Sequence, residues 1–96
     1  MMHMATRYRT ETARLDLRLL HMLKSVAKFA ERGFGPSLRE LKDDTPDTTS
    51  TSVVTYRLDA LQGLGLIDRD AIVARSTRLT PAGWRRLTGE LEGDTS

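Results

Sequence analysis

Apolar residues in the first third of the chain recur at steps of three and four, which is the spacing of one face of an α-helix. They are Leu15, Leu19, Met22, Leu23, Val26, Ala27 and Ala30. The pattern predicts a long first helix over about residues 12–31. This helix should end in the segment 33–36, because its glycines permit a left-handed cap and Pro36 cannot continue a helix.

The Ser-Leu-Arg-Glu stretch that starts at Ser37 has the spacing of a capping box. In such a box the Ser37 side chain accepts from the Glu40 amide, while the Glu40 side chain reaches back to the Ser37 amide. A second helix is therefore predicted to begin at about Leu38, anchored by Leu38 and Leu41. It should be short, because Pro46 pushes the residue before it away from helical angles.

A third helix is predicted over about residues 51–64, where apolar residues recur at i, i+4 and i+7, namely Val54, Leu58 and Leu61. Gly63 or Gly65 would close it. A last helix should begin at Thr80 and Pro81, which suit the N-cap and the first helical position. The apolar positions of this last helix are Trp84, Leu87 and Leu91.

Two short strands are predicted before the last helix, at residues 66–69 and 76–79, with residues 70–75 joining them as a hairpin. The tip of this hairpin is unusual, because Ala71 to Ala74 is apolar and lacks an Asn-Gly type of turn signal. Three helices, a two-stranded hairpin and a final helix, in this order, describe a winged helix-turn-helix domain. The fold class expected is therefore mainly α with a small β-hairpin.

The domain is expected to span residues 12–91, between a basic flexible tail at 1–11 and a frayed C-terminus at 92–96. At 96 residues the chain can bury one small hydrophobic core. Its hydrophobic fraction is 39%, and no apolar run approaches the ~20 residues of a membrane helix, so a soluble protein without a secretory signal is expected. The absence of cysteine excludes disulfides and thiolate metal sites and fits a cytoplasmic location.

The net charge of +2 is unevenly distributed along the chain. Residues 1–35 carry seven Lys or Arg against three acids, residues 36–63 carry three against five, and residues 64–96 carry five of each. This pattern is compatible with a polyanionic partner, although an ordinary solvated surface would explain it as well.

In a winged helix-turn-helix, the third helix enters the DNA major groove with its N-terminal end facing the bases. The outward side chains at the start of this helix should then be short and able to form hydrogen bonds. Residues that meet this requirement are Ser50, Ser52, Thr55 and Tyr56. With the apolar face inward, Ser52, Tyr56 and Asp59 point outward. The alternative is that the hydroxyl run only caps the helix and that Tyr56 packs half-buried.

Contacts to the DNA backbone are expected on either side of these residues. Hydroxyl groups at a helix start bind phosphate, and the positive end of the helix dipole favours it, which suggests Thr49 and Thr51. The helix at about 51–64 would occupy the major groove, while the wing at 66–79 would lie on the backbone through Arg75 and Arg78. The basic tail could add Arg7 and Arg9.

Two stretches, GFGPSLREL at 33–41 and TSTSVVTYRLDALQGLGLIDRD at 49–70, resemble the N-terminal DNA-binding domain of the LexA family of bacterial SOS repressors. An Ala-Arg pair at 74–75, before the second strand, extends the resemblance, which covers roughly residues 15–80. It implies a repressor that binds duplex DNA and whose third helix reads an operator. The base-reading positions that it implies are Ser50, Ser52, Val53, Thr55 and Tyr56, with Arg57 near the backbone and Arg75 near phosphate.

The chain departs from this family in several respects. The turn at 44–47 is one residue longer and more polar, which leaves open which hydroxyl between Thr48 and Ser52 caps the third helix. The LTPAG stretch at 79–83 is similar instead to the segment after the wing in MarR-type and PadR-type regulators. The self-cleaving peptidase domain of the family has no counterpart in the sequence, so autoproteolysis is not expected.

A homodimer is expected, because one such module buries little surface on DNA. The first candidate surface is the last helix, through Trp84, Leu87 and Leu91, and the second is the first helix, through Met22 or Phe29. The alternative function is a winged-helix module that binds protein, such as an assembly factor or anti-repressor. That alternative is favoured by the near-neutral charge and by the acidic residues of the second helix and the following turn.

No cofactor, metal site or enzymatic activity is expected. His3 and His21 have no partners at a metal-binding spacing, and Ser37 has no histidine nearby in sequence to activate it. The glycines at 63 and 65 follow a helix, which is the wrong context for a phosphate-binding loop.

Overall fold

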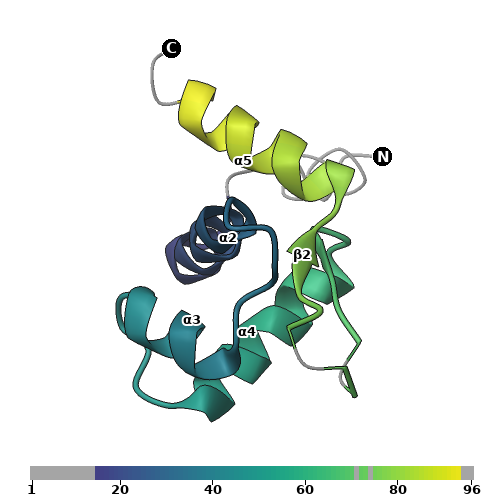
Figure 1. Ribbon diagram of the computed structural model, residues 1–96. Coiled ribbons are helices and arrows are strands. Elements are labelled where there is room, and N and C mark those ends of the chain that lie inside the picture. The colour runs from purple at the N-terminus through teal and green to yellow at the C-terminus, as the bar shows by residue number, and fades with distance from the viewer. Residues whose placement is uncertain (1–14, 71, 74, 94–96) are drawn as a thin grey trace.

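The computed structural model describes residues 15–70, 72–73 and 75–93, with side chains described up to residue 89 (Figure 1). The elements in these residues are α2 (Leu17–Ala30), α3 (Leu38–Asp44), α4 (Thr51–Gly63), β1 (Ile67–Asp68), β2 (Arg78–Leu79) and α5 (Pro81–Gly93). This order confirms the predicted class, a mainly α domain with a two-stranded hairpin in winged helix-turn-helix arrangement. None of the described helices is long and apolar enough to cross a membrane.

The core forms around α2, which contacts α3, α4, α5 and β2. Figure 1 shows α5 on one side of α2, and α3 and α4 on the other. Fully buried side chains come from α2, α3, α4 and β1, and they are Met22, Leu23, Val26, Leu41, Val54, Leu58, Leu61 and Ile67. Burial of each such side chain contributes roughly 1.5–3 kcal/mol, so the apolar stripes predicted from the sequence supply most of the stabilisation.

The first helix begins later than its apolar pattern suggested. Residues 12–14 lie outside the described residues, but Leu15 and Asp16 are not helical, and α2 starts at Leu17. The reason is a cap: the Asp16 carboxylate accepts a hydrogen bond from the Arg18 amide at 2.8 Å. The other end is as predicted, since Gly33 takes a left-handed φ of 89° just after the helix.

The predicted capping box of α3 is confirmed. The Glu40 amide donates to Ser37 Oγ at 3.1 Å, and the Ser37 amide donates to Glu40 Oε1 at 2.8 Å. The helix ends at Asp44, and Thr45 is extended with ψ 125°, as expected before Pro46. Of the two predicted anchors of α3, Leu41 is inaccessible, whereas Leu38 is 38% exposed.

A buried polar cluster supplies the second attachment of α3, which the sequence did not indicate. The Thr45 hydroxyl donates to Ser25 Oγ, and the Ser25 hydroxyl donates to Asp44 Oδ2, both at 2.9 Å. Lys28 Nζ lies 2.6 Å from Asp44 Oδ1. The hydrogen bond from Lys28 lowers the pKa of the Asp44 carboxyl. These contacts fasten the C-terminal end of α3 to α2.

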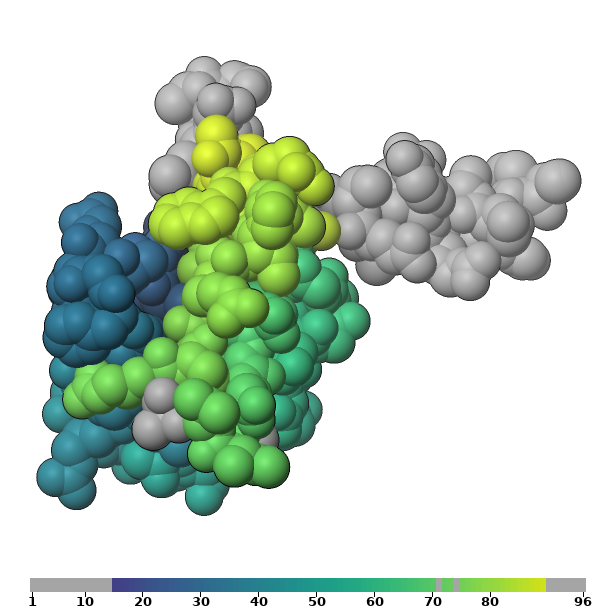
Figure 2. Space-filling view, turned by 45° about the vertical axis from the view of Figure 1, so that its right-hand side comes forward, coloured from purple at the N-terminus to yellow at the C-terminus, as the bar shows by residue number. Residues whose placement is uncertain are grey.

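The hairpin is shorter than the predicted strands 66–69 and 76–79. Only Ile67 pairs with Leu79, and Asp68 with Arg78. Beyond that point the Ser76 side chain replaces the backbone ladder, since its hydroxyl accepts from the Asp70 amide at 2.8 Å and donates to the Asp70 carbonyl at 2.9 Å. Figure 2 shows the hairpin, in green, lying between the blue segment that leads into α3 and the teal surface of α4.

Helix α5 begins as predicted, with Thr80 as its cap. The Thr80 hydroxyl oxygen accepts from the Gly83 amide at 3.0 Å, and the hydroxyl donates to the Gly65 carbonyl at 2.6 Å. The helix continues to Gly93, past the predicted domain boundary at 91. The start of α5 is pressed against the chain before β1, so a Cβ on Gly83 would overlap the Leu66 carbonyl oxygen.

Replacing Gly83 should therefore destabilise the fold, whereas replacing Gly89 in the same helix should not. We expect Gly83→Ala to lower the free energy of unfolding by about 1–3 kcal/mol, because backbone atoms cannot move aside easily. Gly89→Ala meets nothing within 4 Å and should raise it by about 0.5–1 kcal/mol through helix propensity. Urea unfolding followed by circular dichroism measures both. Equal effects of the two substitutions would contradict the described packing of α5 on the chain before β1.

Candidate nucleic-acid interface

The start of α4 settles which hydroxyl caps the helix. Ser50 is extended, with φ −154° and ψ 162°, and its Oγ accepts from the Val53 amide at 3.3 Å. Thr51 and Ser52 are then the first helical residues, and both are exposed. The five-hydroxyl run thus divides into a turn, a cap at Ser50 and an exposed first turn of helix.

The faces of α4 are arranged as the apolar spacing predicted. Val54, Leu58 and Leu61 are fully buried, which turns Ser52, Tyr56 and Asp59 to the outside. Val53 and Thr55 are half-buried on the two flanks of that face. Tyr56 is 75% exposed, so the alternative in which it packs half-buried is wrong. A large aromatic side chain is therefore presented to solvent in the middle of the outer face.

The turn before α4 is held by Arg57. Asp47 takes a left-handed φ of 60°, a conformation that aspartate tolerates better than most residues. The Thr48 hydroxyl donates to the Pro46 carbonyl at 3.1 Å. Arg57 donates through Nη1 to Thr48 Oγ1 at 3.0 Å and through Nη2 to the Asp47 carbonyl at 3.2 Å. Arg57 was predicted only to contact the DNA backbone, but it also fixes the turn that leads into α4. Both of its acceptors, the Thr48 hydroxyl and the Asp47 carbonyl, are neutral.

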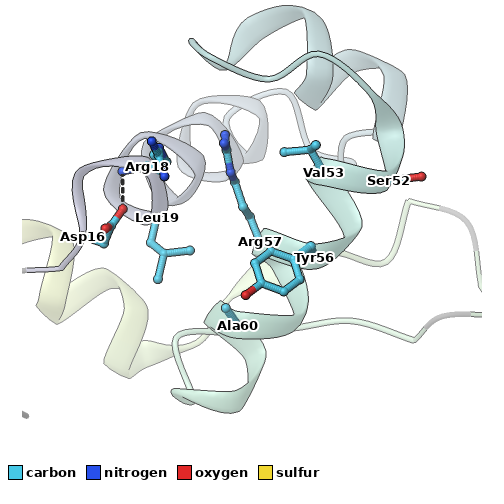
Figure 3. Close-up of a pocket in the computed structure, with 8 residues that line it drawn as sticks. All are labelled: Asp16, Arg18, Leu19, Ser52, Val53, Tyr56, Arg57 and Ala60. Carbon is cyan, nitrogen blue, oxygen red and sulfur yellow. Dashed lines mark hydrogen bonds between the residues drawn. The ribbon is translucent and has the colours of Figure 1, made fainter.

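A groove of about 500 Å³ runs between the start of α2 and the outer face of α4 (Figure 3). The start of α2 contributes its cap Asp16 together with Arg18 and Leu19, and α4 contributes Ser52, Val53, Tyr56, Arg57 and Ala60. The sequence did not indicate the contribution of α2 to this groove, because residues so distant in the chain are brought together only by packing of α2 on α4. The one sequence signal was the excess of basic residues in the N-terminal third.

The arginines of the hairpin are paired with carboxylates. Arg75 Nη1 lies 2.9 Å from Glu40 Oε1 and donates also to the Gly35 carbonyl at 3.3 Å. Arg78 Nη2 lies 3.0 Å from Asp68 Oδ2 across the two strands. Their side chains remain 44% and 66% exposed. The two predicted phosphate contacts of the wing are thus accessible, but each has an acidic partner.

Glu40 connects three segments of the fold. Arg32 binds it with two nitrogens, at 2.6 Å to Oε1 and 2.8 Å to Oε2, while Arg75 reaches it from the hairpin. Both guanidinium groups also lie over the Phe34 ring, at 4.1 Å and 5.4 Å from its centre. The hydrogen bonds from Arg32, and then that from the Ser37 amide, hold the pKa of the Glu40 carboxyl far below its usual range.

The acidic residues of α3 are likewise neutralised. Glu40 pairs with Arg32 and Arg75, Asp43 with Lys42 at 3.1 Å, and Asp44 with Lys28. The acidic character that the sequence suggested for this helix is therefore largely compensated by neighbouring cations.

The candidate dimer residues differ in how far they are exposed. Trp84 is 45% exposed on α5, Leu87 is half-buried against the core, and the side chain of Leu91 lies outside the described residues. Met22 is fully buried, so its proposed place on a dimer surface is wrong. Phe29 packs partly against the core, with the Arg32 guanidinium 4.7 Å from its ring centre.

The helix order, the short hairpin and the polar outer face of α4 define a winged helix-turn-helix domain. The chain is similar to the LexA repressor of Roseiflexus sp. (strain RS-1), with 40% identity over 79 residues, which is 78% of this chain and 36% of that protein. It is also 36% identical over 75 residues to the LexA repressor of Enterococcus faecalis (strain ATCC 700802 / V583), covering 77% of this chain and 35% of that protein. No protein-family model and no solved structure matches the chain.

These comparisons confirm the resemblance to the N-terminal DNA-binding domain of LexA that the sequence motifs indicated. The chain spans about a third of the length of the LexA repressors it matches. The likeness therefore concerns one domain of those proteins.

The low pKa of Glu40 leads to a pH-dependent stability. Because the folded-state pKa lies below the ordinary value of 4.5, the ionised carboxylate stabilises the fold above that pH, and the stabilisation is lost as the pH falls through 4.5 and below. We expect Glu40→Gln to unfold more easily than the unsubstituted protein at neutral pH, with the difference shrinking on acidification. Urea unfolding at several pH values measures this. A difference that stays constant down to low pH would contradict the described role of Glu40.

Proposed function

We propose that this protein binds duplex DNA sequence-specifically and represses transcription by occupying an operator. The observation that carries the proposal is the outer face of α4, where short hydroxyl side chains and the exposed Tyr56 surround the N-terminal turns of the helix. Such side chains can approach base edges in a major groove and form hydrogen bonds there.

In this proposal the position of each residue on α4 decides whether it contacts bases or phosphates. Ser52 and Tyr56 point straight outward and face base edges, with Val53 and Thr55 on the flanks. Ser50 would also face the DNA major groove, while its Oγ caps the helix. Thr49 and Thr51 are exposed at the positive end of the helix, where they would bind phosphate. The hairpin, with Arg75 and Arg78, would follow the backbone.

The relatives support the regulatory part of the proposal. Both are named LexA repressors, and a repressor that shares this domain with the chain suggests the same use of it here. The proposal concerns the domain alone, because the chain spans about a third of those proteins.

A dimer would strengthen such binding. A single module of this kind buries only about 600–1,000 Å² on DNA, and two modules on half-sites one helical turn apart add their contacts. Trp84 on α5 is the dimer residue that we propose, because it is the candidate with a substantially exposed aromatic surface among the described side chains.

The second candidate function is protein binding. It is favoured by the hairpin tip, where Ile72 is 92% exposed and Val73 is 54% exposed. Neighbouring apolar side chains that protrude into solvent mark a contact site in many proteins. Fluorescence anisotropy with random and operator-like duplexes between about 50 and 200 mM salt separates the two functions. No binding at the low-salt end would reject DNA binding and leave the protein partner.

Substitutions on the outer face of α4 should reduce specific binding selectively. We expect Ser52→Ala to weaken binding to a preferred duplex by about 2- to 10-fold, the loss of one hydrogen bond, and Tyr56→Ala by about tenfold. Binding to random duplex should change less. Thr88→Ala, which removes an exposed hydroxyl from α5, is the matched control and should leave both affinities unchanged. Equal losses on all duplexes would show that Tyr56 takes no part in base recognition.

A further inference from the structure

Two arginines without acidic partners lie together beside α4. Arg18 and Arg57 both line the groove between α2 and α4, and Figure 3 shows their side chains pointing to the same side of it. Arg57 donates to a hydroxyl and a carbonyl oxygen, and the Arg18 side chain has no hydrogen bond or ion pair with a described residue. No described carboxylate lies within ion-pair distance of either guanidinium.

The arginines on the opposite flank of α4 do have acidic partners. Arg69, Arg75 and Arg78 are each within 3.0 Å of a carboxylate oxygen, on Asp59, Glu40 and Asp68 respectively. A phosphate would have to compete with those carboxylates for these arginines. Arg18 and Arg57 therefore place positive charge without a described acidic partner on the α2 side of α4, away from the hairpin arginines that were expected to bind phosphate.

The two flanks are on opposite sides of Tyr56. At 100° per residue, Val53, Arg57 and Ala60 lie on one side of Tyr56 along the helix surface. Asp59 and Gln62, which bind the side chain and the carbonyl of Arg69, lie on the other side. A helix in a major groove about 12 Å wide has one DNA backbone on each side of it. One strand would then pass the hairpin, and the other would pass the start of α2.

We propose that Arg18, with Arg57 beside it, binds a phosphate of the DNA strand that passes the α2 side of α4. The inference rests on the proposed function and adds a backbone contact outside the helix-turn-helix and the wing. A guanidinium group matches phosphate oxygens with paired N–H donors, and the N-terminal end of α2 adds a positive partial charge. The one acid of the groove, Asp16, has its Oδ1 bound to the Arg18 amide at 2.8 Å as the helix cap.

The test is the salt dependence of DNA binding by Arg18→Gln. Removing one phosphate contact should lower the slope of log affinity against log salt by about one unit and weaken random and preferred duplexes to the same extent. Lys24→Gln is the matched control, because it removes the same charge from an exposed position of the same helix outside the groove. It should leave the slope unchanged. Circular dichroism confirms that both variants are folded.

The outcomes separate this inference from the proposed function. An unchanged slope in Arg18→Gln, or an equal fall in Lys24→Gln, with normal binding by the unsubstituted protein, would overturn the phosphate contact and leave DNA binding intact. No binding by the unsubstituted protein would overturn both. Phosphate ethylation interference gives a second measurement: ethylation on the strand beside α2 should block the unsubstituted protein and cease to matter in Arg18→Gln.

Discussion

The burial of Val54, Leu58 and Leu61 fixes the rotation of α4 and thereby decides which residues form its outer face. All three side chains are inaccessible, and α4 contacts both α2 and α3. A turn of the helix by one residue would bring Thr55 or Asp59 into the core without a partner, which costs several kcal/mol for a charged group. The same apolar contacts that stabilise the domain thus decide that Ser52 and Tyr56 meet the solvent.

Polar contacts then place the neighbouring segments around α4. Glu40 joins α3, the segment after α2 and the hairpin, while Asp44 joins the end of α3 to α2. These pairs are partly exposed, so each is expected to contribute modestly to stability. Their effect on charge is larger: they neutralise α3 and occupy Arg75, and they leave Arg18 and Arg57 as the pair of cations without acidic partners beside α4.

Local patterns in the sequence predicted most of the fold. Apolar spacing gave the helices, the Ser37 capping box and Thr80 gave two helix starts, and Pro46 gave the end of α3. The inward and outward faces of α4 followed from three apolar residues. The predicted start of α2 and the predicted length of the two strands were wrong. The Asp16 side chain caps α2 at its first turn, and the Ser76 side chain takes the place of backbone hydrogen bonds in the hairpin.

The features that the sequence could not supply are those that join distant residues. The contact of Glu40 with Arg75 spans 35 positions, and the groove brings Arg18 beside Tyr56 through packing of α2 on α4. No local spacing encodes either contact. The N-terminal third has an excess of basic residues, but only the structure places one of them, Arg18, next to the candidate base-reading face.

The most direct test of the account is selection of bound duplexes from a random pool by the unsubstituted protein. If the outer face of α4 reads bases, the recovered duplexes should converge on a defined sequence, and a protein that binds as a dimer should recover a palindrome with half-sites about one helical turn apart. Recovery of duplexes with no sequence in common would contradict base recognition by α4.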